Sequence, residues 1–334
     1  MNVFQQTRRF LQKQLLCALL GVGSVALSQG SFAQTPAWPS KPIRIVVGFA
    51  PGGTTDVLAR LLAQGISESI GQTIVIDNKP GASGNIAAAE VIRATPDGYT
   101  FLVAPTSFET ANPWLFKSNI LPSRDLTPVA GIGRTQMYLV AKPQMNAKDV
   151  KDLVALAKAN PGTMSYASSG SGTPPHLACE LFKQATNTPD ITHIPYRGAA
   201  PALQDVLSGQ ADFVCDPGIA FPHIKTGKVK LLGIVSAKRS PFFPDVPTVA
   251  EQGFKGADLD IWFGLWTPNN TPTEIQARMN KEIGKALSSE VLKTRFADLG
   301  AENTWVESAE FKTLLANEGR VLSKLIHDQK ISVD

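Results

Sequence analysis

Apolar runs alternate with amphipathic segments along the chain from Ile43 onward. Short apolar runs are typical of strands covered on both faces, whereas apolar residues three or four apart indicate helices. The first series predicts strand, helix, strand, helix and strand at residues 43–47, 56–70, 73–76, 83–94 and 100–104. This order predicts a parallel sheet with right-handed crossovers.

A second series of the same kind starts further along the chain. Its strands and helices are predicted in alternation at residues 137–141, 147–159, 164–167, 175–185, 191–195, 199–208 and 213–215. The stretch between the two series, 121–135, is rich in Pro, Gly and polar residues, and we expect a crossing strand or hinge there. The pattern therefore predicts two α/β units, each with its own sheet.

The last part of the chain adds a stretch at 230–235, a Pro-punctuated stretch at 240–248, an apolar run at 261–267 and helices near 272–288 and 308–326. These two helices have no strand pair of their own. We therefore expect them to pack on the first sheet, which makes the first lobe discontinuous in sequence.

The predicted fold class is thus α/β with two lobes and a cleft between them. Lobe 1 is expected to comprise residues 34–134 and 262–334, and lobe 2 residues 135–261. Clefts between two such lobes commonly hold small ligands and close by hinge motion.

The first 33 residues are typical of an export signal. A basic start at Arg8 and Arg9 precedes an apolar stretch at 15–27, and small residues flank Phe32. The stretch is interrupted by Gly and Ser and falls short of the roughly 20 apolar residues of a spanning helix. We expect cleavage after about Ala33 and a periplasmic location, with ordinary secretion and twin-arginine export both left open.

Charge argues against one class of partner. The chain has 32 basic and 28 acidic residues, and loss of the first 33 residues removes three basic residues and no acidic one, which leaves 29 against 28. This balance gives no electrostatic case for binding nucleic acid or an anionic membrane surface. No nucleic-acid partner is predicted.

Two cysteines remain after the signal, because Cys17 leaves with it. An oxidising compartment permits a disulfide between Cys179 and Cys215. Sequence separation does not fix their Cα distance, so a disulfide and two buried thiols both stay open.

Three strand-to-helix junctions combine glycine with small hydroxyl residues. They are GFAPGGTTD at 48–56, NKPGASGN at 78–85 and SSGSGT at 168–173. At such a junction the free N–H groups and the dipole of the helix favour an anion. If the carboxyl ends of the strands of both lobes point at the cleft, the first and third junctions face each other across it. Turn geometry, with Thr55 or Asp56 as a helix cap, is the alternative for any single loop.

Other side chains near these junctions are candidates for the cleft. His176 falls in the first turn of its predicted helix, where a hydrogen bond to the loop is favoured over contact with the ligand. Tyr196 and Arg197 follow a strand, and Arg197 is either a partner of a ligand carboxylate or a solvated rim charge. Asp216 would accept a hydrogen bond from a ligand amino group, hydroxyl or water. Phe49 is either an apolar wall of the cleft or part of the core.

Enzyme signatures are missing from the sequence. It has no phosphate-binding loop, no dinucleotide fingerprint and no nucleophile elbow, so a triad of Ser169, His176 and Asp216 lacks its usual context. The histidines and cysteines do not have the spacing of a metal site. We predict no catalytic residue, no metal and no cofactor.

The motifs together resemble those of a known family. They are Trp38-Pro39, Pro51-Gly52-Gly53-x-x-Asp56, Asn78-x-Pro80-Gly81-Ala82-x-Gly84, Pro96-Asp97-Gly98-Tyr99-Thr100, Ser168-x-Gly170-x-Gly172-Thr173-x-x-His176, Pro195-Tyr196-x-Gly198 and Pro244-Asp245-Val246-Pro247-Thr248-x-x-Glu251-x-Gly253. In this order they resemble the Bug family, the TctC-like extracytoplasmic solute receptors of tripartite tricarboxylate transporters. The resemblance runs from about Trp38 to the C-terminal helices.

The resemblance implies a type II periplasmic-binding-protein fold that closes on a small carboxylate. In that family, loops equivalent to 51–56 and 168–173 hold one carboxylate through backbone amides, small hydroxyls and bridging water, while the far end of the ligand varies. Cys215-Asp216-Pro217, Thr54-Thr55 and Ser83 occupy variable positions, so the sequence does not name the carboxylate.

We therefore predict a monomeric, non-enzymatic receptor that passes a small organic carboxylate to membrane transporter subunits or to a sensor. An exported serine hydrolase that uses Ser169 and His176 on a carboxylic ester, and an adhesive or structural envelope protein, are the alternatives. The predicted ligand-binding residues lie at the junctions and strand ends: Phe49, Pro51, Gly53, Thr54, Thr55, Asp56, Ala82, Ser83, Thr106, Ser107, Ser168, Ser169, Gly172, Thr173, His176, Tyr196, Arg197 and Asp216.

Overall fold

The computed structural model describes residues 38–328 and 330–333 of the protein. The predicted export signal at 1–33 lies outside the described residues. Residues from Pro39 onward form one compact unit. Within the described part, no helix combines the length and apolar character needed to cross a membrane.

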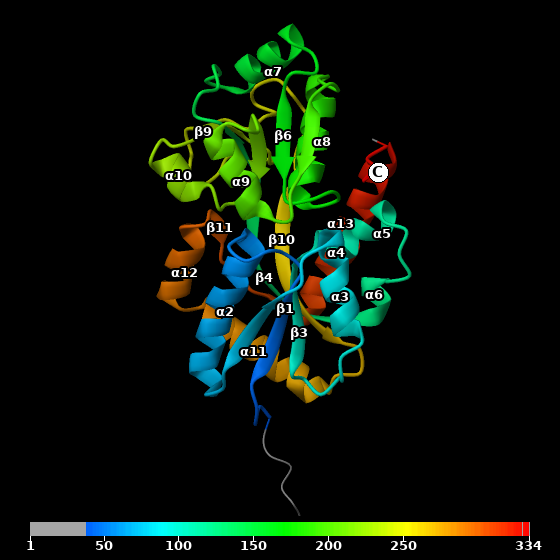
Figure 1. Ribbon diagram of the computed structural model, residues 1–334. Helices are drawn as coiled ribbons and strands as arrows, with labels where there is room; N and C mark the ends of the chain where they lie inside the picture. Colours follow the sequence, from blue (N-terminus) through cyan, green and yellow to red (C-terminus); the bar gives the residue numbers. More distant parts are fainter. Residues whose placement is uncertain (1–37, 329, 334) are drawn as a thin grey trace, which may run out of the picture. The chain divides into compact units, whose positions relative to one another are not determined.

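The first sheet has the strand order β11-β4-β10-β3-β1-β2, with β12 paired to β4 (Figure 1). Its strands are β1 (Ile43–Val47), β2 (Ile74–Asn78), β3 (Thr100–Pro105), β4 (Leu126–Gln136), β10 (Asp260–Pro268), β11 (Ala301–Glu302) and β12 (Val306–Glu307). β1 is parallel to β2 and β3, as predicted, whereas β10 runs antiparallel to β3 and β4. The segment at 121–135, where a crossing strand or hinge is expected, thus contributes a long strand of this sheet.

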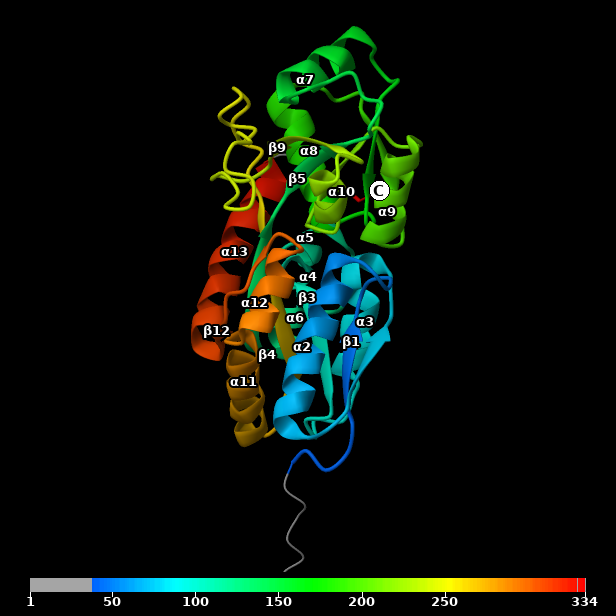
Figure 2. The same cartoon turned by 90° about the vertical axis from the view of Figure 1, so that its left-hand side faces the viewer.

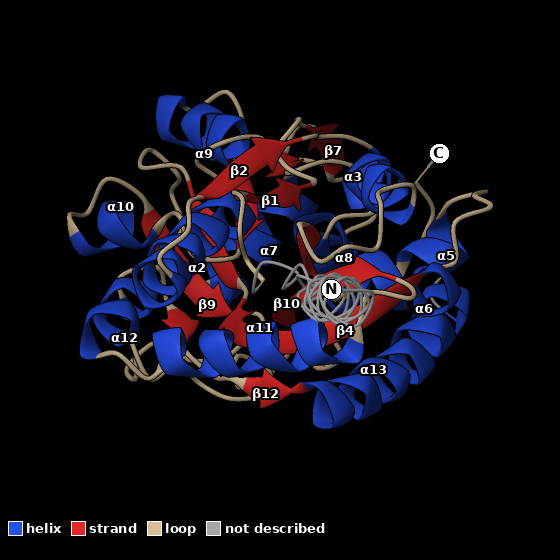
Figure 3. Cartoon of the chain, turned by 90° about the horizontal axis from the view of Figure 1, so that it is seen from below, coloured by secondary structure: helices blue, strands red, loops and turns tan. Residues whose placement is uncertain are grey.

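Helices cover both faces of the first sheet (Figure 3). They are α2 (Thr54–Ile70), the short helix η1 (Ala82–Gly84), α3 (Asn85–Ile92), α4 (Ser107–Thr110), α5 (Asn112–Leu115), α6 (Pro122–Asp125), α11 (Thr273–Leu287), α12 (Glu290–Ala297) and α13 (Ser308–Asp328). α3 and α13 pack on one face through a core that includes Val46, Leu102 and Phe311. α2, α11 and α12 contact one another and lie together in Figure 2. The expected packing of the C-terminal helices on the first sheet is therefore confirmed, although α12 was not predicted.

The second sheet has the order β7-β6-β8-β5-β9. Its strands are β5 (Tyr138–Ala141), β6 (Ser165–Ser168), β7 (Thr192–Pro195), β8 (Phe213–Asp216) and β9 (Lys230–Ile234), and its helices are α7 (Val150–Ala159), α8 (Pro174–Thr186), α9 (Ala199–Ser208) and α10 (Phe221–Lys225). β6 is parallel to β7 and β8, whereas β5 is antiparallel to β8 and β9.

A disulfide joins Cys179 of α8 to Cys215 of β8. Their Cα atoms are 5.9 Å apart, a distance within the usual range for a disulfide. Of the two alternatives left open by the sequence, the structure has the disulfide. It ties α8 to a central strand of the second sheet.

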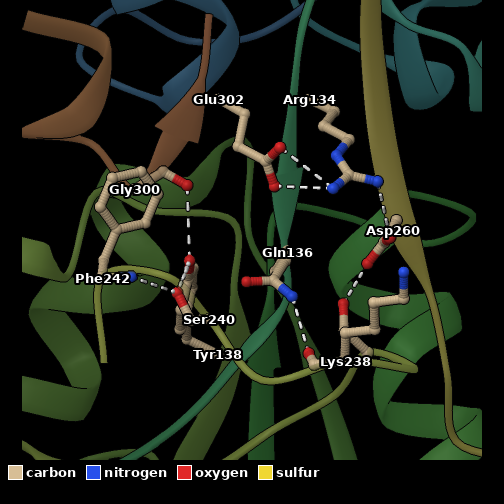
Figure 4. Close-up of polar contacts among 10 residues, drawn as sticks. Arg134, Gln136, Tyr138, Lys238, Ser240, Phe242, Asp260, Gly300 and Glu302 are labelled. Carbon is tan, nitrogen blue, oxygen red and sulfur yellow. Dashed lines mark hydrogen bonds and ion pairs between the residues drawn. The ribbon is translucent and has the colours of Figure 1, made fainter. Parts of the chain in front are cut away.

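The chain passes between the two sheets along paired segments. Met137 alone separates β4 from β5, and its carbonyl accepts a hydrogen bond from the N–H of Val235 at 2.7 Å. The Val235 carbonyl in turn accepts from Leu259 N–H, just before β10. Figure 4 shows side chains reinforcing this crossing: the Gln136 amide donates to the Lys238 carbonyl at 2.8 Å.

Two buried carboxyl groups lie between α4 and α13. Glu318 accepts hydrogen bonds from the hydroxyls of Thr106 at 2.8 Å and Thr110 at 3.2 Å, while Glu109 accepts one from the Trp266 indole N–H at 2.7 Å. Glu318 Oε2 is buried and has no hydrogen-bond partner among the described residues. Burial raises the pKa of each carboxyl group to about 7, against the opposing effect of these hydrogen bonds.

We predict that Glu318→Gln stabilises the protein in mildly alkaline buffer. A carboxyl group whose folded pKa is raised contributes its full stability below the ordinary pKa of 4.5 and loses it as the pH rises through about 7. Glutamine removes the charge but keeps an acceptor for the two threonines. The substitution should raise the free energy of unfolding at pH 8 by on the order of 1–3 kcal/mol and change it little at pH 5.

Urea denaturation at both pH values measures this difference. Glu310→Gln, at an exposed position of the same helix, is the matched control and should change the free energy of unfolding by less than about 0.5 kcal/mol. Equal effects of Glu318→Gln at pH 5 and pH 8 would contradict the prediction.

Candidate ligand-binding site

The N-terminus of α2 follows the first glycine-rich junction and has no side-chain cap. Gly53 occupies the N-cap position in an extended conformation, and no side chain among the described residues caps the helix there. Thr54 and Thr55 are buried, and the Thr54 hydroxyl has no hydrogen-bond partner among the described residues. The first turn of α2 thus combines open N–H groups with an unpaired hydroxyl, a combination suited to an anion.

Asp56 fixes the loop that leads into this helix. Its carboxylate accepts hydrogen bonds from Gly52 N–H at 2.9 Å, from Asn78 Nδ2 at 2.8 Å and from Arg60 Nε at 2.9 Å. Burial alone would raise the pKa of Asp56, but these hydrogen bonds and the Arg60 charge outweigh it, so the pKa lies below its ordinary value. Asp56 is therefore a charged anchor for the loop, although the sequence analysis counted it among the ligand-binding residues.

The third junction differs from the expected row of free N–H groups. α8 begins with Pro174 and Pro175, which carry no N–H. Within the loop, Gly170 N–H donates to Ser168 Oγ and Gly172 N–H donates to Nδ1 of His176, both at 3.1 Å. The loop at 168–173 therefore satisfies much of its own backbone and offers fewer donors than the sequence suggested.

His176 shapes this loop, as the Gly172 bond shows, and it stacks on His193 with ring centroids 4.4 Å apart. Burial lowers the pKa of His176, and burial together with the neighbouring His176 lowers the pKa of His193 to about 4. Both rings are therefore neutral near pH 7. Ser168 Oγ lies 2.7 Å from Nε2 of His193.

The bonds of Asp216 argue against a hydrolytic triad. Asp216 is buried, and its Oδ1 accepts from the N–H groups of Gly218 at 2.7 Å and Ala220 at 2.9 Å. Burial raises the pKa of Asp216 to about 6. His176 Nδ1 accepts a hydrogen bond from Gly172 N–H. No hydrogen bond among the described residues joins Ser169, His176 and Asp216.

The N-terminus of α9 faces the first junction from the other lobe. A Cβ placed on its N-cap, Gly198, would lie 2.8 Å from the Cβ of Ala50, and Gly198 has a φ of +149°. Only glycine fits there without strain. Two helix N-termini, those of α2 and α9, therefore approach the same space from opposite lobes.

A small cavity lies between these elements, with about 20 Å³ of space open to a water-sized group. Five of the predicted residues line it, namely Phe49, Gly53, Thr54, Thr55 and Ser169. β3 and β10 add Pro105, Ile261 and Phe263, and the second lobe adds Pro174, Pro175, Ala199 and Pro217. The seven added residues were not predicted. For Ile261 and Phe263 a signal existed in the apolar run at 261–267, because residues two apart on a strand point to one face.

Most of the other predicted residues make structural bonds or face solvent, but the buried Ser107 hydroxyl has no hydrogen-bond partner among the described residues. Ser83 Oγ donates to the Gly172 carbonyl at 3.1 Å and so links the second junction to the third. Thr173 Oγ1 donates to the Gly170 carbonyl at 2.6 Å. Thr106 bonds Glu318, as described above. The remaining positions are Ser107, which is buried, Tyr196, which is half-buried, and Pro51, Ala82 and Arg197, which are exposed.

We predict that Asp56→Ala lowers the free energy of unfolding by about 2–4 kcal/mol, because three donors lose a buried acceptor. Chemical denaturation measures the change. Arg60→Ala, at a side chain that is half exposed, should cost less than about 1 kcal/mol. If Asp56→Ala were no more destabilising than Arg60→Ala, the anchoring role of Asp56 would be wrong.

Solved structures of three proteins resemble this chain closely. The periplasmic binding protein BugD is 32% identical and superposes with a TM-score of 0.84 over 88% of this chain and 99% of its own. MatC from Rhodopseudomonas palustris, solved with bound malate, is 33% identical with a TM-score of 0.81 over 86% and 100%. An R. palustris protein solved with adipate is 34% identical with a TM-score of 0.85 over 88% and 99%.

These similarities confirm the predicted two-lobe α/β fold of a periplasmic binding protein. They lend no support to the serine hydrolase alternative, since these relatives are solute-binding proteins. The sequence profile described as the tripartite tricarboxylate transporter family receptor, TctC, matches residues 58–331. The chain therefore belongs to this non-enzymatic family of periplasmic receptors, as the motifs predicted.

Proposed function

We propose that this protein captures a small organic carboxylate in the cavity between its lobes and passes it to the membrane subunits of a tripartite tricarboxylate-type transporter, or to a sensor. Membership of the receptor family and the malate and adipate held by two relatives support a carboxylate ligand. Delivery to particular membrane subunits or to a sensor belongs to the proposal alone.

The observation that carries the proposal is the uncapped N-terminus of α2. Gly53 contributes no capping side chain, and the buried Thr54 hydroxyl has no partner among the described residues, although both residues line the cavity. A carboxylate oxygen would satisfy these donors through charge-assisted hydrogen bonds. Neutral donors hold the anion without the desolvation cost of a buried cation.

Ser169 is the proposed contact from the second lobe, because it lines the cavity opposite Gly53 and Thr55. The sequence analysis also counted Thr173, in the facing loop at 168–173, among the ligand-binding residues. The Thr173 hydroxyl already donates to its own loop, so its proposed role is to hold that loop in place. The hydrogen bond from Ser83 to the Gly172 carbonyl, already present in this structure, would hold the lobes together around the ligand.

The proposal includes the export and organisation that the sequence predicted. Residues 1–33 are removed after about Ala33, and the mature chain works in the periplasm as a monomer. Its lobes comprise 34–134 with 262–334, and 135–261. The division of strands between two sheets, with the crossing at Met137, supports these lobe bounds.

We predict that Gly53→Asp reduces affinity for the bound carboxylate at least 100-fold. The added carboxylate would occupy the N-cap of α2, take its N–H groups and repel the ligand. Isothermal titration calorimetry measures the loss, after a thermal-shift panel of malate, adipate, benzoate and hexanoate identifies a ligand, since a ligand of the folded state raises its stability.

Gly53→Ala is the matched control. A Cβ at this position would make only ordinary contacts of 3.6–3.8 Å with Ala50 and Ala199, so affinity should stay within about threefold of the wild type. Undiminished binding by Gly53→Asp would overturn the proposed carboxylate site.

A further inference from the structure

The cavity has no side chain that could pair with a second negative charge. None of the residues that line it is Lys, Arg, His, Asp or Glu. Its polar groups gather where α2 begins, with Thr54 and Thr55, and on the facing loop at Ser169. An ionised group elsewhere in the cavity would lose its water without gaining a partner, which is unfavourable.

The rest of the wall is apolar and comes from several elements. Phe49 follows β1, Pro105 ends β3, and Ile261 and Phe263 lie two apart on β10. Pro217 completes this wall from the second lobe. Such a surface favours hydrocarbon, since apolar area removed from water is the main source of affinity in sites of this kind.

The basic side chains near the cavity form an ion pair, are neutral or lie outside its lining. The Arg60 guanidinium bonds Asp56, and its side chain is half exposed. His176 and His193 are neutral near pH 7 because burial lowers the pKa of each. Arg197 is exposed and does not line the cavity. Asp216, next to Pro217, would repel a second carboxylate when ionised.

We propose that the ligand is a small monocarboxylate with an apolar body. Its carboxylate would bind at the N-terminus of α2, and its hydrocarbon would lie against Phe49, Ile261 and Phe263. This inference rests on the proposed carboxylate site and narrows its ligand class. In this conformation the cavity has about 20 Å³ of space open to a water-sized group, enough for about one water, so a ligand of this class would enter as the lobes separate.

Two matched pairs of ligands test the inference on the wild-type mature chain by calorimetry. Hexanoate and adipate share six carbons and differ in the second carboxylate, and benzoate and terephthalate differ in the same way. We expect the monocarboxylate of at least one pair to bind ten or more times tighter than its dicarboxylate. Tighter or equal binding of the dicarboxylate in both pairs would overturn the inference and leave the proposed carboxylate receptor standing.

A charge placed in the apolar wall gives a second, independent readout. Ile261→Lys should weaken hexanoate binding and strengthen adipate binding by tenfold or more, whereas Ile261→Met, which keeps the wall apolar, should keep the wild-type order. Should Ile261→Lys fail to fold, the ligand pairs decide alone.

If neither these four ligands nor malate bind the wild type, the inference falls together with the proposed function. Binding of malate alone would overturn only the inference.

Discussion

The site depends on one helix end that the protein leaves without a side-chain cap. Ser, Thr, Asp and Asn are the preferred N-cap residues, and glycine in their place costs only about a few tenths of a kcal/mol. Here Gly53 stands at that position. The Asp56 carboxylate accepts from the N–H of Gly52, the residue before the N-cap, and not from the N–H groups of the first turn. Asp56 turns back to the N–H of Gly52 and to Asn78. The loop is therefore rigid while the first turn of the helix keeps its donors.

The second lobe meets this helix end mainly through backbone and small side chains. Gly198 lets α9 approach Ala50, and the Gly172 carbonyl receives the Ser83 hydroxyl. Larger residues at Gly198 would hold the lobes apart. The two sheets meet again at the crossing near Met137, where neighbouring strands bond each other through Val235. The geometry between the helix ends is therefore set by close backbone contacts and a short, bonded crossing.

Much of this architecture was predictable because it is encoded locally. The alternation of apolar runs and amphipathic segments predicted the order of strands and helices, and glycine with small hydroxyl residues at 48–56 marked the helix end that lines the cavity. The short helix α12 and the two-residue strands β11 and β12 were missed, since elements of this length carry too little periodicity to stand out. The disulfide stayed open because it depends on a Cα distance that only tertiary packing sets.

The apolar wall could be predicted only in part, for a different reason. Ile261 and Phe263 belong to the apolar run noted at 261–267, but which side chains of β10 meet the cavity depends on pairing with β3 and β4, more than a hundred residues away in sequence. The prediction of free N–H donors at the start of α8 was wrong for a simpler reason, because Pro174 and Pro175 begin that helix. A helix N-terminus was counted as a row of donors without subtracting the residues that have no N–H.

β10 has a consequence for how such receptors diversify. Its backbone is held on both sides by β3 and β4, so exchanging the side chains at 261 and 263 alters the cavity without shifting the strand. The groups proposed to grip a carboxylate sit on α2 and the loop at 168–173 instead. The carboxylate and the rest of the ligand are thereby recognised by separate parts of the chain. Substitutions at 261 and 263 can then change the ligand that is preferred without altering the groups proposed to bind its carboxylate.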